Sequence, residues 1–158
     1  MDSKISYLEA KSKVEALCAY QEKCQFDIDK KLFDWGFNQE ERDQLISHLI
    51  SYNFINEERF ASAFTSGKFK IKKWGRIKIK SHLKAKNISE YSIKKGLSEI
   101  NSSEYWDMIM YLANRKVKDI STKQESVWEK KGKIYRFLAS KGFESELINE
   151  AISDLNFK

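Results

Sequence analysis

The side chains with the clearest chemical meaning are ten basic residues in one segment that has no acidic residue. Between Arg59 and Ser89 the chain carries ten lysines or arginines and no aspartate or glutamate. Such cationic groups repel one another, and an anionic partner relieves that repulsion. The segment therefore predicts a contact surface for nucleic acid, for an acidic protein surface, or for both. The candidate contact residues are Lys68, Lys70, Lys72, Lys73, Trp74, Arg76, Lys78, Lys80 and Lys84.

Charge is unevenly distributed along the whole chain of 158 residues. The net charge is −4 for residues 1–62, +9 for residues 63–100 and +1 for residues 101–158. A secondary basic cluster lies in the last part, where Glu125 and Glu129 partly balance it. Its members are Lys130, Lys131, Lys133 and Arg136. The middle of the chain is therefore the first candidate for binding a polyanion.

Catalysis and metal binding have little support in the residue pattern. Cys18 and Cys24 are six residues apart, and His48 and His82 belong to different parts of the chain, so no local spacing brings four ligands together. The six glycines are scattered and form no phosphate-binding loop. We predict a non-enzymatic protein without metal, cofactor or small-molecule substrate.

The compartment follows from what the chain does not contain. No apolar run approaches the roughly 18 residues that cross a bilayer, and the first residues lack the apolar centre of a signal peptide. Two cysteines are too few for a disulfide framework. A cytoplasmic protein without membrane contact is the expectation.

One sequence pattern occurs three times along the chain, and it predicts the helices on which the basic side chains lie. The pattern is a leucine, three further residues, a glycine or asparagine, and then an apolar residue. The three segments are Leu32 to Gly36-Phe37, Leu83 to Asn87-Ile88, and Leu138 to Gly142-Phe143. Glycine and asparagine adopt the left-handed conformation that ends a helix, after which the apolar residue packs back on the leucine. Each segment therefore predicts a helix end followed by a second helix.

Capping residues and apolar spacing supply the remaining helix boundaries. Asn38 with Glu41 resembles a capping box, and Asn56 and Ser89 are candidate N-caps. Ser102 or Ser103 would cap the helix that contains Trp106, and Ser145 would replace Glu144 as a cap. Ile5, Leu8, Val14 and Leu17 predict an apolar stripe on the first helix. The predicted fold is all-α, an elongated, curved array of three tandem three-helix repeats with about nine helices. The predicted repeats are 1–56, 57–101 (basic) and 102–158.

Within the basic segment several roles stay open. Arg76, Lys80 and Lys84 share one predicted helix face, whereas Ile79 and Leu83 mark the apolar one. Trp74 either covers the core at a turn or stacks on a partner. Arg59 either pairs with Glu57 or Glu58 or faces the partner, and Phe60 and Phe64 are expected in the core.

The helix corners also allow a helix-turn-helix reading, in which a second helix enters a DNA groove. The corresponding helices of the first and third repeats are rich in glutamate, which phosphate repels. Only the middle helix, with Lys94 and Lys95, remains compatible with that reading. A structural corner is the preferred interpretation.

The same residues resemble the RecX family, bacterial regulators of the RecA recombinase. The matching segments are Ile55-Asn56-Glu57-Glu58-Arg59-Phe60-Ala61 with Phe64, then Lys72-Lys73-Trp74-Gly75-Arg76-Ile77-Lys78-Ile79-Lys80-Ser81-His82-Leu83, then Lys86-Asn87-Ile88. Arg76, His82 and Asn87 depart from the family pattern, which often has proline, glutamate and glycine there. The resemblance covers nearly the whole chain and implies three tandem three-helix units.

The resemblance implies a function in DNA repair and the SOS response. Members of the family lie in the groove of RecA–DNA filaments and restrain filament growth, ATP hydrolysis, strand exchange and co-protease activity. The expected partners are the RecA filament and single- or double-stranded DNA. The alternative is a general basic helical module that binds nucleic acid without a specific protein partner.

Overall fold

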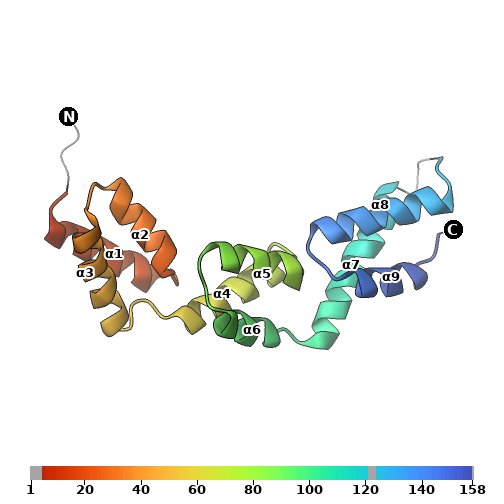
Figure 1. The fold of residues 1–158 in the computed structure, drawn as a ribbon. Coiled ribbons are helices and arrows are strands. Elements are labelled where there is room, and N and C mark those ends of the chain that lie inside the picture. The colour runs from red at the N-terminus through yellow and green to blue at the C-terminus, as the bar shows by residue number, and fades with distance from the viewer. Residues whose placement is uncertain (1–4, 121–123, 158) are drawn as a thin grey trace. The chain divides into compact units, whose positions relative to one another are not determined.

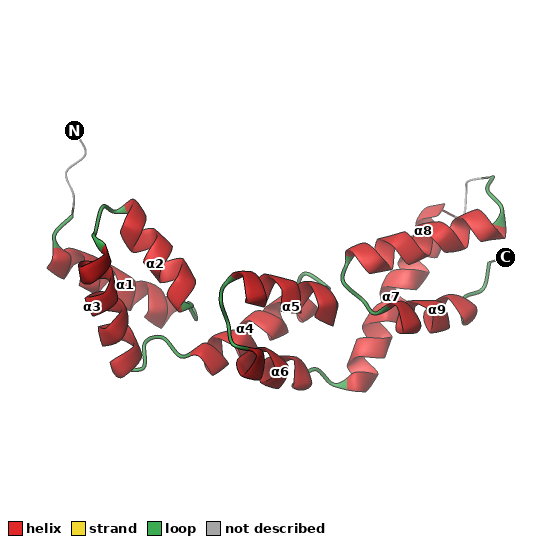
Figure 2. Ribbon diagram, viewed as in Figure 1, coloured by secondary structure: helices red, strands yellow, loops and turns green. Residues whose placement is uncertain are grey.

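The computed structural model describes residues 5–120 and 124–157, and within these ranges the chain is helical and has no strand. Figure 1 labels the helices, and Figure 2 shows that loops and turns alone join them. The described helices are α1 (Tyr7–Tyr20), α2 (Gln25–Asp34), α3 (Gln39–Ser51), α4 (Glu57–Lys70), α5 (Arg76–Ala85), α6 (Glu90–Ser98), α7 (Ser102–Ile120), α8 (Val127–Ser140) and α9 (Ser145–Ser153). The predicted all-α fold of about nine helices is confirmed.

The three predicted helix ends have the expected geometry. Gly36, Asn87 and Gly142 have φ angles of 93°, 60° and 95°. After each of them, the next backbone N–H donates a hydrogen bond to the leucine carbonyl five residues earlier, at 3.1 Å for Phe37 and 3.2 Å for both Ile88 and Phe143. This is the hydrogen bond of a Schellman ending, so α2, α5 and α8 end through one local mechanism.

Most predicted helix starts are also observed. Asn38 and Glu41 form the capping box of α3. The Asn56 side chain accepts a hydrogen bond from the Arg59 N–H at 2.9 Å, and the Ser89 hydroxyl accepts one from the Ser92 N–H at 3.3 Å. These side chains satisfy N–H groups that have no partner within their own helices.

Two predicted caps are wrong. The start of α7 is capped by Asn101, whose side chain accepts a hydrogen bond from the Glu104 N–H at 3.0 Å, and not by Ser102 or Ser103. Glu144 keeps the N-cap position of α9 without a capping hydrogen bond, and Ser145 is the first residue of the helix. The Glu144 carboxylate has other partners, described below.

The chain divides into two compact units. The first holds the residues up to Ala63 together with Leu83–Lys95. Here α3 packs on α1 and α2 around a core that contains Val14, Ile28, Leu32, Leu45 and Leu49. The predicted stripe on α1 is wrong at Leu8, which is 74% exposed. The residues that α1 buries are Ala10, Val14 and Cys18, spaced at one turn each.

The second unit holds Phe64–His82 and Gly96–Lys158. Its helices α7, α8 and α9 pack on one another. The buried side chains of these helices and of the turn between α8 and α9 include Tyr105, Ile109, Ile134, Leu138, Phe143 and Ile148. The repeat limits 1–56, 57–101 and 102–158, and the elongated, curved arrangement, stay predictions. No described helix combines the length and the apolar content that crossing a membrane requires.

Candidate partner-binding surface

The basic segment lies at the end of α4, in the turn after it, and along α5. Lys73, in that turn, has a φ angle of 59°. Among the described residues, the other positions with positive φ are glycines or asparagines. A lysine there has a Cβ close to the following carbonyl oxygen, which costs about 1–2 kcal/mol. The turn is nevertheless well defined, since the Trp74 N–H donates to the Lys68 carbonyl at 3.0 Å.

Trp74 is half-buried and packs against cationic side chains. The Nζ atoms of Lys68 and Lys78 lie 4.9 Å and 4.6 Å from the centroid of the Trp74 ring. The ring of His82 contacts it at a centroid distance of 4.5 Å. The electron-rich faces of the indole attract both ammonium groups. Trp74 therefore holds two of the candidate lysines in place.

Arg76 is engaged inside the protein. Its Nη1 donates to Glu144 at 2.9 Å, and its guanidinium carbon lies 3.8 Å from the centroid of the Tyr105 ring. The Tyr105 hydroxyl accepts from the Arg76 backbone N–H at 3.0 Å and donates to Glu144. Burial, followed by the hydrogen bond to Glu144, raises the pKa of Tyr105 above its usual value. The one guanidinium of the predicted contact surface thus links α5 to α7 and to the start of α9.

The candidate lysines differ in their surroundings. Lys84 pairs with Glu90 at 3.7 Å. Lys70, Lys72 and Lys80 are exposed, whereas Lys68, Lys73 and Lys78 are half-buried. Among the described residues none of these last six forms an ion pair with a carboxylate. Ile79 and Leu83 are fully buried, which confirms the predicted apolar face of α5.

Lys141 joins this basic group, and the sequence interpretation missed it. It follows α8, and its Nζ donates to the Lys72 carbonyl at 3.0 Å. Its pKa is lowered by burial and by the nearby charges of Lys78, Lys73 and Lys72. In the sequence Lys141 is one ordinary residue of the leucine–glycine pattern, so no local signal identifies it.

Two turns in direct backbone contact bring Lys141 to this place. The Gly75 N–H donates to the Lys141 carbonyl at 2.8 Å, and the Ile77 N–H donates to the Gly142 carbonyl at 3.0 Å. A Cβ on Gly75 would lie 2.3 Å from the Gly142 oxygen, and a Cβ on Gly142 would lie 2.3 Å from the Lys78 Cβ. Only glycine allows this approach at the two positions.

The secondary basic cluster is partly neutralised. Lys133 pairs with Glu125, and Lys131 lies 5.8 Å from the centroid of the Phe157 ring. Neighbouring Trp128 is 83% exposed. Lys130 is half-buried and Arg136 is exposed.

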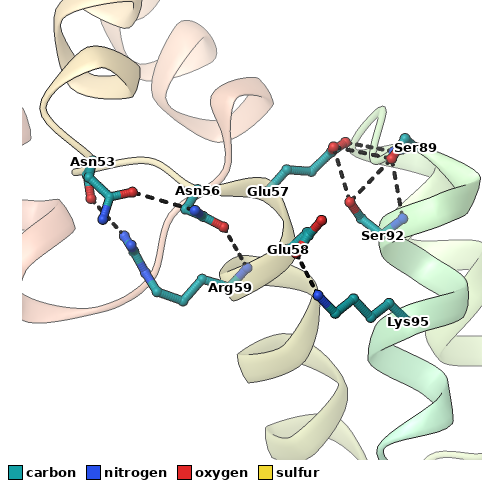
Figure 3. A network of polar contacts seen from close by, with 8 residues as sticks. All are labelled: Asn53, Asn56, Glu57, Glu58, Arg59, Ser89, Ser92 and Lys95. Carbon is teal, nitrogen blue, oxygen red and sulfur yellow. Dashed lines mark hydrogen bonds and ion pairs between the residues drawn. The ribbon is translucent and has the colours of Figure 1, made fainter.

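The residues at the start of α4 serve the first unit (Figure 3). The Arg59 Nε donates to Glu22 at 2.6 Å, a pairing that neither of the two open alternatives for Arg59 named. The Glu57 carboxylate instead accepts from the Ser89 N–H at 2.6 Å and from the hydroxyls of Ser89 and Ser92.

Two lysines near α6 are also engaged within the first unit. Glu58 pairs with Lys95 at 2.8 Å, and Lys86 pairs with Asp27 at 2.9 Å. Lys95, one of the two lysines compatible with the helix-turn-helix reading, is therefore held by a carboxylate. Phe60 is buried, as predicted, whereas Phe64 is half-buried beneath Lys68.

The cysteines are buried free thiols. Burial is the main cause that raises the pKa of Cys24 to about 11. Among the described residues, no group of three or more histidine, cysteine, aspartate or glutamate side chains is arranged to hold a metal ion.

Comparison with known proteins gives two family models. The model described as the second three-helix domain of RecX matches residues 56–97. The model described as the third three-helix domain of RecX matches residues 103–152. The basic segment from Lys68 to Lys84 lies within the first of these matches, and Lys141 lies within the second.

Curated relatives carry the same family name. The chain is 28% identical over 137 residues to the regulatory protein RecX of Clostridium botulinum (strain Alaska E43), an alignment that covers 86% of this chain and 64% of the relative. It is 29% identical over 133 residues to the regulatory protein RecX of Clostridium perfringens (strain 13), covering 84% and 62%. The chain thus spans less than two thirds of the length of these relatives.

Solved structures share the fold. The crystal structure of RecX from Lactobacillus salivarius matches with a TM-score of 0.80 and 21% identity, over 94% of this chain and 96% of that one. A second crystal structure, of a regulatory protein RecX, matches with a TM-score of 0.81 and 23% identity, over 94% and 72%. Since two RecX domain models match in order along the sequence, this chain belongs to the RecX family.

Proposed function

We propose that this chain regulates the RecA recombinase, mainly as an inhibitor, by binding in the groove of RecA–DNA filaments. Bound there, it restrains filament growth, ATP hydrolysis, strand exchange and co-protease activity during DNA repair and the SOS response. Membership of the RecX family supports the regulatory role, and the relatives are named regulatory proteins. No catalytic step is part of this proposal.

The observation that carries the proposal is a set of lysines around α4 and α5 that have no carboxylate partner in the described part of the chain. Lys70, Lys72 and Lys80 are exposed and form no ion pair among the described residues. A surface that keeps such charges uncompensated gains free energy when a polyanion displaces its counterions. Filaments of RecA on DNA offer phosphates and acidic protein side chains to such a surface.

The test measures DNA-dependent ATP hydrolysis by RecA while the protein is added below saturation. Wild-type protein is expected to lower the rate. Reversing two exposed charges, Lys70→Glu and Lys80→Glu together, is expected to raise the concentration for half inhibition at least tenfold, because each reversal turns an attraction into a repulsion. Equal inhibition by the doubly reversed protein, with unchanged helicity, would refute a role for this surface.

A second candidate function is a general nucleic-acid-binding module without a protein partner. The lysine-rich composition of the surface favours it, since ammonium groups bind phosphates of any sequence. The two functions differ when the protein is added to preformed RecA filaments in the presence of excess bare DNA. A filament regulator still inhibits there, whereas a general DNA binder is titrated by the bare DNA and releases RecA.

A further inference from the structure

The turn between α4 and α5 and the turn between α8 and α9 concentrate positive charge at one point of the second unit. Lys72 and Lys73 lie in the turn between α4 and α5, Lys78 is the third residue of α5, and Lys141 lies in the turn between α8 and α9. The ammonium group of Lys141 is tied to the Lys72 carbonyl at 3.0 Å. We call these four lysines the junction lysines.

In the described part of the chain, none of the junction lysines forms an ion pair with a carboxylate, although Glu144 is part of the same junction. That carboxylate is already bound by Arg76 and by the Tyr105 hydroxyl. The pKa of Lys141 is lowered first by burial and then by repulsion from Lys78, Lys73 and Lys72.

The backbone conformation of Lys73 is an independent indication of function. Its φ is 59°, whereas the four other described positions with positive φ are all glycines or asparagines. Glycine at position 73 would relieve the steric cost, so folding alone favours a different residue there. Residues that keep an unfavourable backbone conformation concentrate at binding sites.

We propose that Lys72, Lys73, Lys78 and Lys141 form a phosphate-binding site for the sugar-phosphate backbone of a DNA strand. This inference rests on the proposed function and deepens it, because it names the ligand and adds a contact from the third three-helix domain. Ammonium groups bind phosphate oxygens as point charges, and a DNA strand carries a row of phosphates that can each meet one lysine. The guanidinium of Arg76 is already paired with Glu144, so the four lysines are the junction cations that remain for the ligand.

The direct contact between the two turns makes the site rigid. Hydrogen bonds from the Gly75 and Ile77 N–H groups fix the carbonyls of Lys141 and Gly142 at 2.8 Å and 3.0 Å. Trp74 holds Lys78 by a cation–π contact at 4.6 Å. Because the ammonium groups of Lys78 and Lys141 are held before the ligand arrives, binding requires less ordering of these two side chains.

The test measures binding of fluorescein-labelled (dT)40 to the full chain by anisotropy, over a range of KCl concentrations. Removing one junction lysine, by Lys73→Gly or Lys141→Gln, is expected to reduce the slope of log K against log salt by about 0.7 and to weaken binding about fourfold at 0.15 M salt. Combining both changes with Lys78→Gln should weaken binding about 50-fold. The matched control is Lys30→Gln, an exposed lysine of α2 outside the site, which should change neither quantity.

Lys73→Gly separates a binding role from a structural one. It removes the charge while relieving the backbone, so its melting temperature should not fall below that of the wild-type protein. Weaker binding by a variant that is at least as stable supports the site. Binding and salt dependence equal to those of Lys30→Gln would overturn the proposal.

Two further readouts identify the ligand. At constant ionic strength, millimolar ATP should not displace (dT)40 from wild-type protein, and displacement would assign the site to a nucleotide. If the junction variants no longer inhibit RecA but bind DNA with unchanged affinity, the ligand of the site is an acidic protein surface. Full inhibition of RecA by the triple variant, together with unchanged DNA binding, would overturn this inference and leave the proposed function standing. No effect of wild-type protein on RecA would remove the proposed function alone.

Discussion

The same substitution, glycine to alanine, should change stability in opposite directions at two positions eight residues apart. Gly67 lies inside α4, and a Cβ there meets nothing within 4 Å. Gly75 lies at the contact of the two turns, where a Cβ would lie 2.3 Å from the Gly142 oxygen and 2.6 Å from the Phe143 nitrogen. Both obstacles are backbone atoms, which cannot move aside as a flexible side chain can.

The magnitude at Gly75 follows from the hydrogen bonds that the clash breaks. Reaching ordinary van der Waals contact requires a retreat of about 1 Å, which would stretch the bonds from the Gly75 and Ile77 N–H groups beyond hydrogen-bonding length. Losing two such bonds costs roughly 2–4 kcal/mol, offset by about 0.4–1 kcal/mol from the smaller entropy of the unfolded alanine chain. Gly75→Ala should therefore lower the free energy of unfolding by about 2–3 kcal/mol. Gly67→Ala should raise it by about 0.5–1 kcal/mol, because alanine is the better helix former.

Thermal unfolding followed by circular dichroism at 222 nm measures both effects. For a chain of this size, the expected changes are a fall in Tm of about 5–10 °C for Gly75→Ala and a rise of about 2–4 °C for Gly67→Ala. A Gly75→Ala protein that melts at or above the wild-type temperature would refute the close contact of the two turns. An unchanged melting temperature of the Gly67→Ala protein would contradict the free space around position 67.

Three further results are expected. The pKa of the Cys24 thiol is raised from 9.0 to about 11, so this thiol should resist alkylation by iodoacetamide in the native protein at pH 8, and rapid alkylation would contradict its burial. The stability that the buried neutral thiol contributes should be complete below pH 9 and should disappear as the pH rises to 11. Asn101→Ala should lower the free energy of unfolding by about 1 kcal/mol in urea titrations, whereas Ser102→Ala should change it by less than half as much, and equal effects would contradict Asn101 as the cap. Arg59→Ala should cost about 1–3 kcal/mol in the same titrations, because Glu22 loses its ion pair, and a neutral result would rule that pair out as a stabilising contact.

Helix ends were predictable because their physics is local. Whether Gly36, Asn87 or Gly142 ends a helix depends on its own φ angle and on a hydrogen bond to a residue five positions earlier. The capping box of Asn38 and Glu41 likewise joins residues three positions apart. Such patterns can be read without knowing where the rest of the chain lies.

Predictions failed where several local solutions have similar free energies. Asn101, Ser102 and Ser103 are adjacent and all able to cap a helix, and the observed cap is the residue one position before the predicted pair. Leu8 satisfies helical spacing as well as Ala10 does, yet the core accepts the smaller residue. Periodicity identifies a helix more reliably than it identifies the face that the helix buries.

The positive charge of the candidate surface could be predicted from the sequence, but which residues form that surface could not. The acid-free segment from Arg59 to Ser89 follows from composition alone. Arg76 is unavailable to a partner because it pairs with Glu144, 68 residues later. Lys141 lies beside the basic segment because the turn after α4 contacts the turn after α8. The sequence left open whether Arg59 pairs with Glu57 or Glu58 or faces the partner, and in the structure it pairs with Glu22, 37 residues earlier.

Sequence alone determined that this protein is helical, where most of its helices end, and that its middle is cationic, because backbone conformation, capping and charge belong to residues close together in the chain. Tertiary structure decided which cations remain available to a ligand. That choice depends on ion pairs and backbone contacts between residues distant in sequence, and each of them requires a folded chain to bring its two partners within hydrogen-bonding distance.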